Sequence, residues 1–305
     1  MIATIAIPLD GTPLSLAALP LARAEAQAHG ARLVLLRIVP AAEAPDDPLL
    51  KAVQADLALA AINLAGNGVA VEVVCARVEE RADVAAAILR EARASQADLL
   101  IMAEAIAPIT AALAGDAVAA AVLAQSELPV LLVRVRDWAD AAWRPGASVL
   151  VEVDGTPAAR AALVAAATIA RITHGEVTVL RVLVPARASG LAGYEEYADL
   201  ADARTYVETQ ANALRATGIT TRGLAQFGAG PATVAAVARR LNAGMVVMSM
   251  PTHEGPICTA CQRDAETIAQ ALACPVVFAW QPPTRPDSFA VAASLPAGTF
   301  ARRHA

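Results

Sequence analysis

Aromatic side chains are scarce in this chain of 305 residues: phenylalanine, tryptophan and tyrosine together make up 3% of it, although 57% of the residues are hydrophobic. Alanine and valine supply that excess, so the core has to be built from small aliphatic side chains, which favours close packing of helices on a sheet. Basic residues are also outnumbered, and the formal net charge is -5. A chain without a basic field is not expected to bind nucleic acid or anionic lipid.

Export and membrane signals are missing as well. No basic region precedes the first apolar run, which predicts a strand rather than a signal peptide. The apolar stretch 105–124 is long enough to span a bilayer, but it contains a proline, a glycine and the carboxylate of Asp116, which argue against membrane insertion. Four cysteines without an export signal do not indicate a disulfide scaffold. The expected compartment is the cytoplasm.

A repeat is the strongest signal that is present. The segment 5–40 returns as the segment 149–185, and both copies contain DGTP, then HG, and end in VP. Asp10 thereby pairs with Asp154 and His29 with His174, with an offset of 144 to 145 residues throughout this segment. The later apolar runs repeat in the same order, up to LPVLLV in the first copy and CPVVFA in the second. The pattern predicts duplication of a whole domain.

Within each copy, short apolar runs alternate with helical stretches, which indicates βαβ units and a parallel sheet with helices on both faces. The sequence predicts two repeated, doubly wound α/β domains of five strands each. In the first copy strands are expected near 2–8, 32–39, 69–75, 98–102 and 129–134, with helices near 13–29, 47–66, 81–95 and 113–126. In the second copy strands are expected near 147–153, 176–183, 219–226, 244–249 and 275–280.

Domain boundaries follow from the breaks in this pattern. We expect a first domain at residues 1–137 and a linker at 138–146, where proline and glycine interrupt the apolar periodicity. A second domain is expected at 147–281. The remaining segment, 282–305, opens with a proline-rich polar run and is interpreted as an extended tail.

The order of these motifs resembles the universal stress protein family, whose domains open with a strand ending in D-G-S or D-G-T and close with an L-P-V or C-P-V strand. Here these are PLDGTP and LPVLLV, then EVDGTP and CPVVFA. The resemblance covers about 280 residues. It implies a flavodoxin- or Rossmann-like fold of the adenine nucleotide alpha hydrolase type. It also implies that the two domains pair within the chain, and a homodimer is a further possible assembly.

Nucleotide-binding members of that family carry G-x2-G-x9-G-[ST] after the fourth strand, where bare backbone approaches the phosphates. In the first copy an ungapped match gives Ala103, Ile106, Asp116 and Ala117. A shift of one residue recovers Gly115, but the carboxylate of Asp116 then replaces the hydroxyl. In the second copy the match gives Ser249, Thr252, Gln262 and Arg263. We therefore expect no cofactor and no ATP held in the family's usual way, although Arg263 remains able to meet an anion.

What survives of the family site lies at the ends of the first two strands of each copy. The resemblance places ligand-binding positions at Asp10, Gly11 and Val39, and at Asp154, Gly155 and Leu183. In ligand-binding relatives the aspartate faces the adenine and ribose end of the pocket. From the residues alone the competing interpretation is structural, because Asp-Gly after a strand also makes a turn and caps the next helix.

Three other groups of residues have both a functional and a structural interpretation. His253, Cys258 and Cys261 fall in the stretch that replaces the second phosphate loop, where they suggest zinc or thiol chemistry but are equally interpreted as packing. The two repeated histidines precede glycine at helix ends and are assigned no catalysis. The only tyrosines, in the segment 194–206, either roof a pocket, form a partner surface or cover the sheet.

One main hypothesis and two alternatives follow. The main hypothesis is a tandem universal stress protein that acts as a non-catalytic, regulatory binding protein whose partner is another protein or a small apolar or adenine-bearing ligand. The first alternative is an ATP-binding switch, with weak ATPase activity, whose phosphates are held by groups other than glycines. The second is a thiol-redox or zinc-binding protein that uses Cys258 and Cys261.

Overall fold

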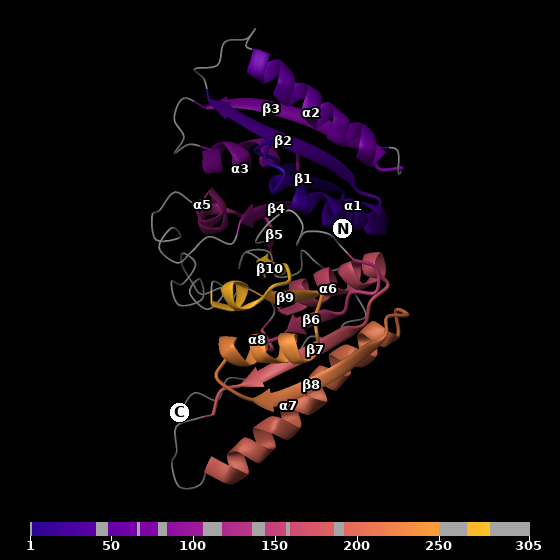
Figure 1. Ribbon diagram of the computed structural model, residues 1–305, viewed down its shortest axis with the longest axis vertical. Coiled ribbons are helices and arrows are strands. Elements are labelled where there is room, and N and C mark those ends of the chain that lie inside the picture. The colour runs from indigo at the N-terminus through magenta and orange to yellow at the C-terminus, as the bar shows by residue number, and fades with distance from the viewer. Residues whose placement is uncertain are drawn as a thin grey trace. The chain divides into compact units, whose positions relative to one another are not determined.

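The computed structural model describes residues 2–40, 48–65, 68–78, 84–105, 118–135, 144–156, 159–185, 192–249 and 267–280. The chain divides into two compact units (Figure 1). One is built mainly on Met1–Ala142 and the other mainly on Trp143–Pro251 and Cys258–Ala279. Each unit contains one copy of the repeat.

The first unit is a parallel sheet with the strand order β3-β2-β1-β4-β5. Its strands are β1 (Thr4–Pro8), β2 (Arg32–Pro40), β3 (Val71–Val78), β4 (Leu99–Ala105) and β5 (Val130–Val135). The central strand β1 is covered on both faces and is apolar apart from Thr4, and Ile5, Ala6 and Ile7 have no exposed surface. The chain reverses direction across the sheet between β1 and β4, which is the switch point where such sheets bind ligands.

The helices of this unit are α1 (Leu19–His29), α2 (Pro48–Ala65), α3 (Val84–Ala94) and α5 (Val118–Gln125). Right-handed crossovers place α1 and α2 on one face of the sheet and α3 and α5 on the other (Figure 1). The doubly wound α/β fold predicted from the repeat is confirmed. Among the described residues, no helix is long and apolar enough to cross a bilayer.

The first helix differs from the single helix predicted over 13–29. A short 3-10 helix, η1 (Ser15–Ala18), comes first, and α1 begins only at Leu19. Pro20 lies in the first turn of α1, where its missing N–H costs nothing, but it cannot donate to a carbonyl four residues earlier. The α-helical pattern therefore cannot extend backwards through η1.

The second unit repeats the topology as β10-β9-β6-β7-β8. Its strands are β6 (Val149–Glu152), β7 (Val177–Leu183), β8 (Thr221–Phe227), β9 (Met245–Ser249) and β10 (Val276–Trp280). The helices are α6 (Ala159–Thr173), α7 (Ala192–Arg215) and α8 (Pro231–Arg240), and residues 267–271 are also helical. No proline interrupts α6, which runs through the positions that form both η1 and α1 in the first unit.

The spacing between the copies is not constant, as the predicted third strands near 69–75 and 219–226 already implied. Leu33 pairs with Val71 and Val177 with Thr221, so the offset grows from 144 at the second strand to 150 at the third. The difference matches the helices between these strands, since α2 has 18 residues and α7 has 24. Duplication has therefore kept the strands and lengthened one helix.

The helix ends that carry the repeated histidines also differ. After His29, Gly30 takes the left-handed conformation, with φ +65°, as predicted for a glycine cap. In the second unit His174 itself is left-handed, with φ +53°. Gly175 is needed there for space instead, because a Cβ at this position would overlap the carbonyl oxygen of Ala147. The predicted glycine cap is therefore wrong for the second copy.

Candidate functional site

Both copies form the same hydrogen-bonded turn at the end of the first strand, which we call the DGT turn (residues 10–12 and 154–156). Asp10 Oδ1 accepts hydrogen bonds from the Thr12 amide, at 2.8 Å, and from the Thr12 hydroxyl, at 2.6 Å. Asp154 Oδ1 accepts the same two bonds from Thr156, at 2.9 and 2.6 Å. One oxygen of each carboxylate is thus used by the turn itself, as the structural interpretation of Asp-Gly expected.

In each copy, an arginine on the neighbouring strand donates a hydrogen bond to the carbonyl oxygen just before the turn. Arg37 Nη1 donates to the Leu9 carbonyl oxygen at 3.1 Å, and Arg181 Nη1 donates to the Val153 carbonyl oxygen at 3.2 Å. Gly11 has φ +83°, and a Cβ there would lie 3.2 Å from Arg37 Nη1. The glycine therefore permits both the left-handed turn and the close approach of the guanidinium.

Sequence reasoning missed this arginine pair. The available signal was a single charge inside an otherwise apolar strand, in LVLLRIVP and in VTVLRVLVP, at the repeat offset of 144. A buried strand rarely carries a cation without a partner for it. The same position in both copies points to a structural partner that is also duplicated, and that partner is the carbonyl at the end of the first strand.

The electrostatics of the first turn favour charged Asp10. Partial burial raises its pKa, but hydrogen bonds from the Thr12 side chain and amide, a hydrogen bond from Ser15 and the charge of Arg37 outweigh burial, so the pKa is lowered. Cys75, which pairs with Arg37 in the β2–β3 register, shows the opposite balance. Burial raises the pKa of its thiol despite the nearby guanidinium, so Cys75 is not an activated thiolate.

The second turn has more ionisable neighbours. Burial, and next the charge of Asp154, raise the pKa of Glu152 to about 7 against the opposing charge of Arg181. Tyr206, on α7, is 8% exposed. Burial and the charges of Asp154 and Glu152 raise the pKa of its hydroxyl to about 12, again against Arg181. Tyr206 therefore lies at the site as a neutral phenol, and of the three alternatives for the tyrosines it fits the covering of the sheet.

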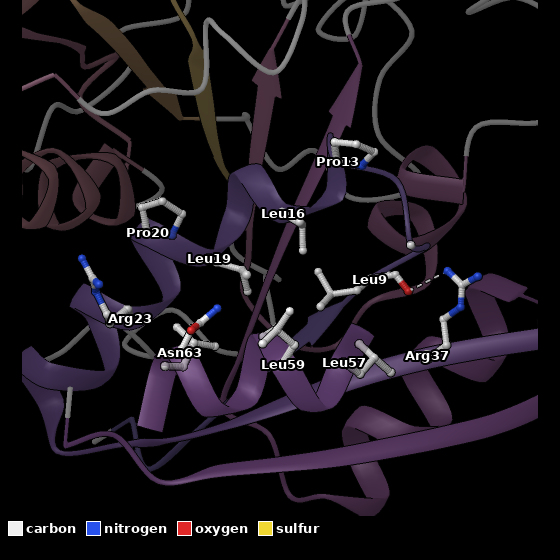
Figure 2. A pocket seen from close by; sticks show the side chains of 13 residues that line it. Leu9, Pro13, Leu16, Leu19, Pro20, Arg23, Arg37, Leu57, Leu59 and Asn63 are labelled. Atoms are coloured by element: carbon white, nitrogen blue, oxygen red, sulfur yellow. Dashed lines mark hydrogen bonds between the residues drawn. The ribbon is translucent and has the colours of Figure 1, made fainter. Parts of the chain in front are cut away.

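A cavity of about 470 Å³ opens beside the first turn, between η1, α1 and α2 (Figure 2). Figure 2 shows leucines from both helical segments facing one another across it, with Arg37 at one end and Arg23 near the other. The lining residues are Leu9, Gly11, Pro13, Leu16, Leu19, Pro20, Arg23, Arg37, Leu57, Leu59, Ala60, Asn63 and Leu64. The volume falls within the usual range for small-molecule sites, roughly 300–1,000 Å³.

Few of the predicted site residues line this cavity. Among those that the structure describes, only Gly11 does. Val39 is buried in β2 with 2% exposed, and Leu183 ends β7, where its carbonyl oxygen accepts a hydrogen bond from the Gly228 amide at 2.9 Å.

The fourth strand of each copy carries the position at which the family motif has its first glycine. Here the residues at these positions have side chains. Ala103 lies within β4 and is followed by Glu104, whose carboxylate is 3.5 Å from Nε of the buried Arg134. Ser249 ends β9 with 6% exposed, and its hydroxyl has no hydrogen-bond partner among the described residues.

Several predicted positions lie outside the described residues. These are Gly115, Asp116, Arg263, His253, Cys258 and Cys261, together with most of the predicted linker and the tail 282–305. Within the described ranges, no three His, Cys, Asp or Glu side chains are grouped so that they could hold a metal ion. Cys75 and Cys274 are free thiols.

Comparison with known proteins agrees with the repeat and the fold. A model of the Universal stress protein family matches residues 1–134 and, a second time, residues 147–279. The chain belongs to the universal stress protein family. It is a tandem member, since both copies match. No curated protein sequence gives a significant match.

Solved structures show the same architecture. A universal stress protein from Archaeoglobus fulgidus DSM 4304 has a TM-score of 0.64 and 17% identity, over 92% of this chain and 97% of that one. A candidate universal stress protein from Pseudomonas aeruginosa UCBPP-PA14 has a TM-score of 0.65 and 20% identity, over 96% and 98%. The cytoplasmic domain of a prokaryotic cation chloride cotransporter has a TM-score of 0.56 and 10% identity, over 92% and 96%. At these identities the likeness concerns the fold alone.

Proposed function

We propose that this tandem universal stress protein is a non-catalytic regulatory protein that binds a small molecule in its first unit. The observation that carries the proposal is the composition of the cavity beside the first DGT turn. Among the described residues, its lining contains leucines, prolines, one asparagine and two arginines, but no carboxylate, imidazole, thiol or hydroxyl side chain. Such a lining can hold and orient a ligand, whereas general acid–base or nucleophilic catalysis needs one of the groups that it lacks.

The degenerate phosphate motif supports the same proposal. Glycine backbone that cradles phosphates has been replaced by Ala103 beside the Glu104–Arg134 pair in the first unit and by Ser249 in the second. A carboxylate close to the phosphate position repels a polyanion, and a side chain fills the space that bare backbone leaves. The family's ATP site is therefore not the expected ligand site of this chain, which we place in the cytoplasm.

Equilibrium dialysis of the full chain against labelled ATP, with released phosphate measured in parallel, tests the proposal. We expect no retained ATP and no phosphate above the protein-free blank. Stoichiometric retention of ATP, or phosphate release that Asp10→Ala and Asp154→Ala abolish, would show instead that the chain is a nucleotide-binding switch. Native mass spectrometry of the same preparation detects a co-purifying small molecule or metal and counts the subunits. A stoichiometric zinc ion would support the alternative based on Cys258 and Cys261.

A further inference from the structure

The cavity of the first unit is apolar along its length and cationic at its ends. Leu9, Leu16, Leu19, Leu57 and Leu64 supply much of the apolar wall. The two arginines of the lining come from different elements, one from β2 and one from α1, and Figure 2 shows them at opposite ends of the row of leucines. A ligand that matches this cavity has an apolar body and an anionic end.

Arg37 is the arginine whose guanidinium is held in place at the cavity and can bind an anion. Its Nη1 is engaged by the Leu9 carbonyl oxygen, which fixes the guanidinium beside the cavity. Its Nε is buried and has no hydrogen-bond partner among the described residues. Within the same part of the chain, no carboxylate lies within ion-pair distance of Arg37 or of Arg23, and one oxygen of the nearby Asp10 is occupied by Thr12.

A guanidinium held in this way presents a donor pair that fits a carboxylate. Nη1 uses one of its two N–H groups on Leu9, and both Nη1 and Nη2 lie next to Gly11, which lines the cavity. The two nitrogens lie in one plane and can together donate two parallel hydrogen bonds, which a planar carboxylate accepts. The exposure of Leu59, at 59%, gives the apolar part of the ligand a hydrophobic surface to cover at the same cavity.

We propose that the first unit binds an amphipathic carboxylate, with the carboxylate on Arg37 and a hydrocarbon body between η1, α1 and α2. The proposal rests on the proposed function and names the class of its ligand. A nucleoside triphosphate fits this cavity poorly, because its charge would be buried among leucines. An uncharged hydrocarbon fits the walls but leaves the Arg37 guanidinium without a counter-charge.

Isothermal titration calorimetry of the full chain with decanoate, below its micelle concentration, is the direct test. We expect one site per chain. Acetate, which has the charge without the body, should give no measurable binding. The neutral analogue 1-decanol should bind at least about tenfold more weakly than decanoate, because it cannot form the charge-assisted pair with Arg37.

Two pairs of variants locate the site. Arg37→Gln should weaken decanoate binding at least about tenfold, whereas Arg181→Gln, which removes the matching strand-end bond in the second unit, should leave it unchanged. Ala60→Phe should abolish binding by filling the cavity. Ala58→Phe places the same ring at an exposed position of α2 outside the lining and should bind decanoate as the parent does.

The outcomes separate this inference from the proposed function. Absence of decanoate binding, equal loss in Arg37→Gln and Arg181→Gln, or unchanged binding in Ala60→Phe would overturn the amphipathic carboxylate. If another small molecule co-purifies in any of those cases, the binding function stands and only the ligand class is wrong. Retention of ATP in the dialysis experiment contradicts the proposed function whatever decanoate does.

Discussion

The two units build the same DGT turn and surround it with different chemistry. At matched positions the first unit has Pro8 and Leu16 where the second has Glu152 and Arg160. The turns nevertheless agree to within 0.1 Å in their aspartate–threonine hydrogen bonds. The turn is therefore specified by its own three residues and by the arginine of the next strand, so its surroundings were free to diverge after duplication.

The divergence gives the copies different capacities. Apolar residues around the first turn leave a cavity with a fixed guanidinium, which suits a ligand from outside the protein. Around the second turn, protein groups supply both charges, since Glu152, Asp154 and Arg181 interact electrostatically with one another or with Tyr206. We therefore propose ligand binding for the first copy and expect a pH response from the second.

The largest expected loss of stability comes from replacing the glycines that follow α1 and α6. Gly175→Ala forces a Cβ into the carbonyl of Ala147, so we expect the free energy of unfolding of the second unit to fall by about 3 kcal/mol. Gly30→Ala meets no atom within 4 Å and only strains a left-handed residue, so it should lower the stability of the first unit by about 1 kcal/mol. Chemical denaturation of both variants, monitored by circular dichroism, measures the two losses of stability. Equal losses would contradict the different roles of the two glycines.

The next effect is a pH dependence restricted to the second unit. The folded pKa of Glu152, about 7, lies above the ordinary value of 4.5, so the folded state binds the proton more tightly. The contribution of this group to stability should therefore be greatest below pH 4.5, fall by about 3 kcal/mol as the pH rises through 7, and then level off. Denaturation of Glu152→Gln at pH 5 and pH 8 should show that this slope is gone.

Asp10 gives the first unit a dependence of the opposite sign. Its folded pKa is lowered, so its contribution is present above the unfolded pKa of about 3.8 and is lost as the pH falls through the folded value. For the second unit, if Glu152→Gln keeps the dependence of stability on pH between pH 5 and pH 7, Glu152 is not the source of that dependence.

A moderate effect is expected when the turn acceptor is removed. Asp10→Ala and Asp154→Ala each delete two hydrogen bonds to the following threonine, and we expect each to lower stability by about 1–2 kcal/mol. Thr12→Val and Thr156→Val remove the hydroxyl bond but keep the amide bond, so they should cost less. Thermal melts of the four variants test whether the two turns contribute equally, as their geometry indicates.

The smallest expected change in stability comes from copying one unit into the other. Leu16→Arg gives the first unit the residue that the second unit has at this position, and because Leu16 is partly exposed the stability should change by less than about 1 kcal/mol. Its effect on decanoate should be much larger, since the new side chain occupies the cavity wall. Preserved binding with preserved stability would show that the wall at Leu16 does not contact the ligand.

The architecture could be predicted from the sequence because its signals are local and occur twice. Apolar runs such as IAIPLDG and VLVEVDG mark buried strands before turns, and their repetition makes chance agreement improbable. The break at Pro20 was also readable in principle, because proline excludes one backbone bond, yet the continuous apolar pattern around it favoured a single helix. The additional residues before β8 were readable too, because the third strands were predicted 150 residues apart, whereas the segments around the first two strands repeat at 144 to 145.

The site was less predictable, because it depends on contacts across the sheet. Asp10 and Gly11 are adjacent in the sequence and were identified from a motif, but Arg37 reaches the turn only through the register of β1 and β2. The cavity depends on how two helices are spaced over one face, to which residues as distant as Leu16 and Leu59 contribute. No local pattern encodes an empty volume.

The longer helix of the second unit changes how its strand ends can be reached. Since the offset of 150 places the start of α2 opposite residue 198, the first six residues of α7 have no helical counterpart among the described residues of the first copy. At 1.5 Å per residue they extend the helix by about 9 Å beyond the point where its twin begins. A molecule that approaches the second sheet from this face must pass the additional helix, so duplication preserved the strands and altered the depth of access.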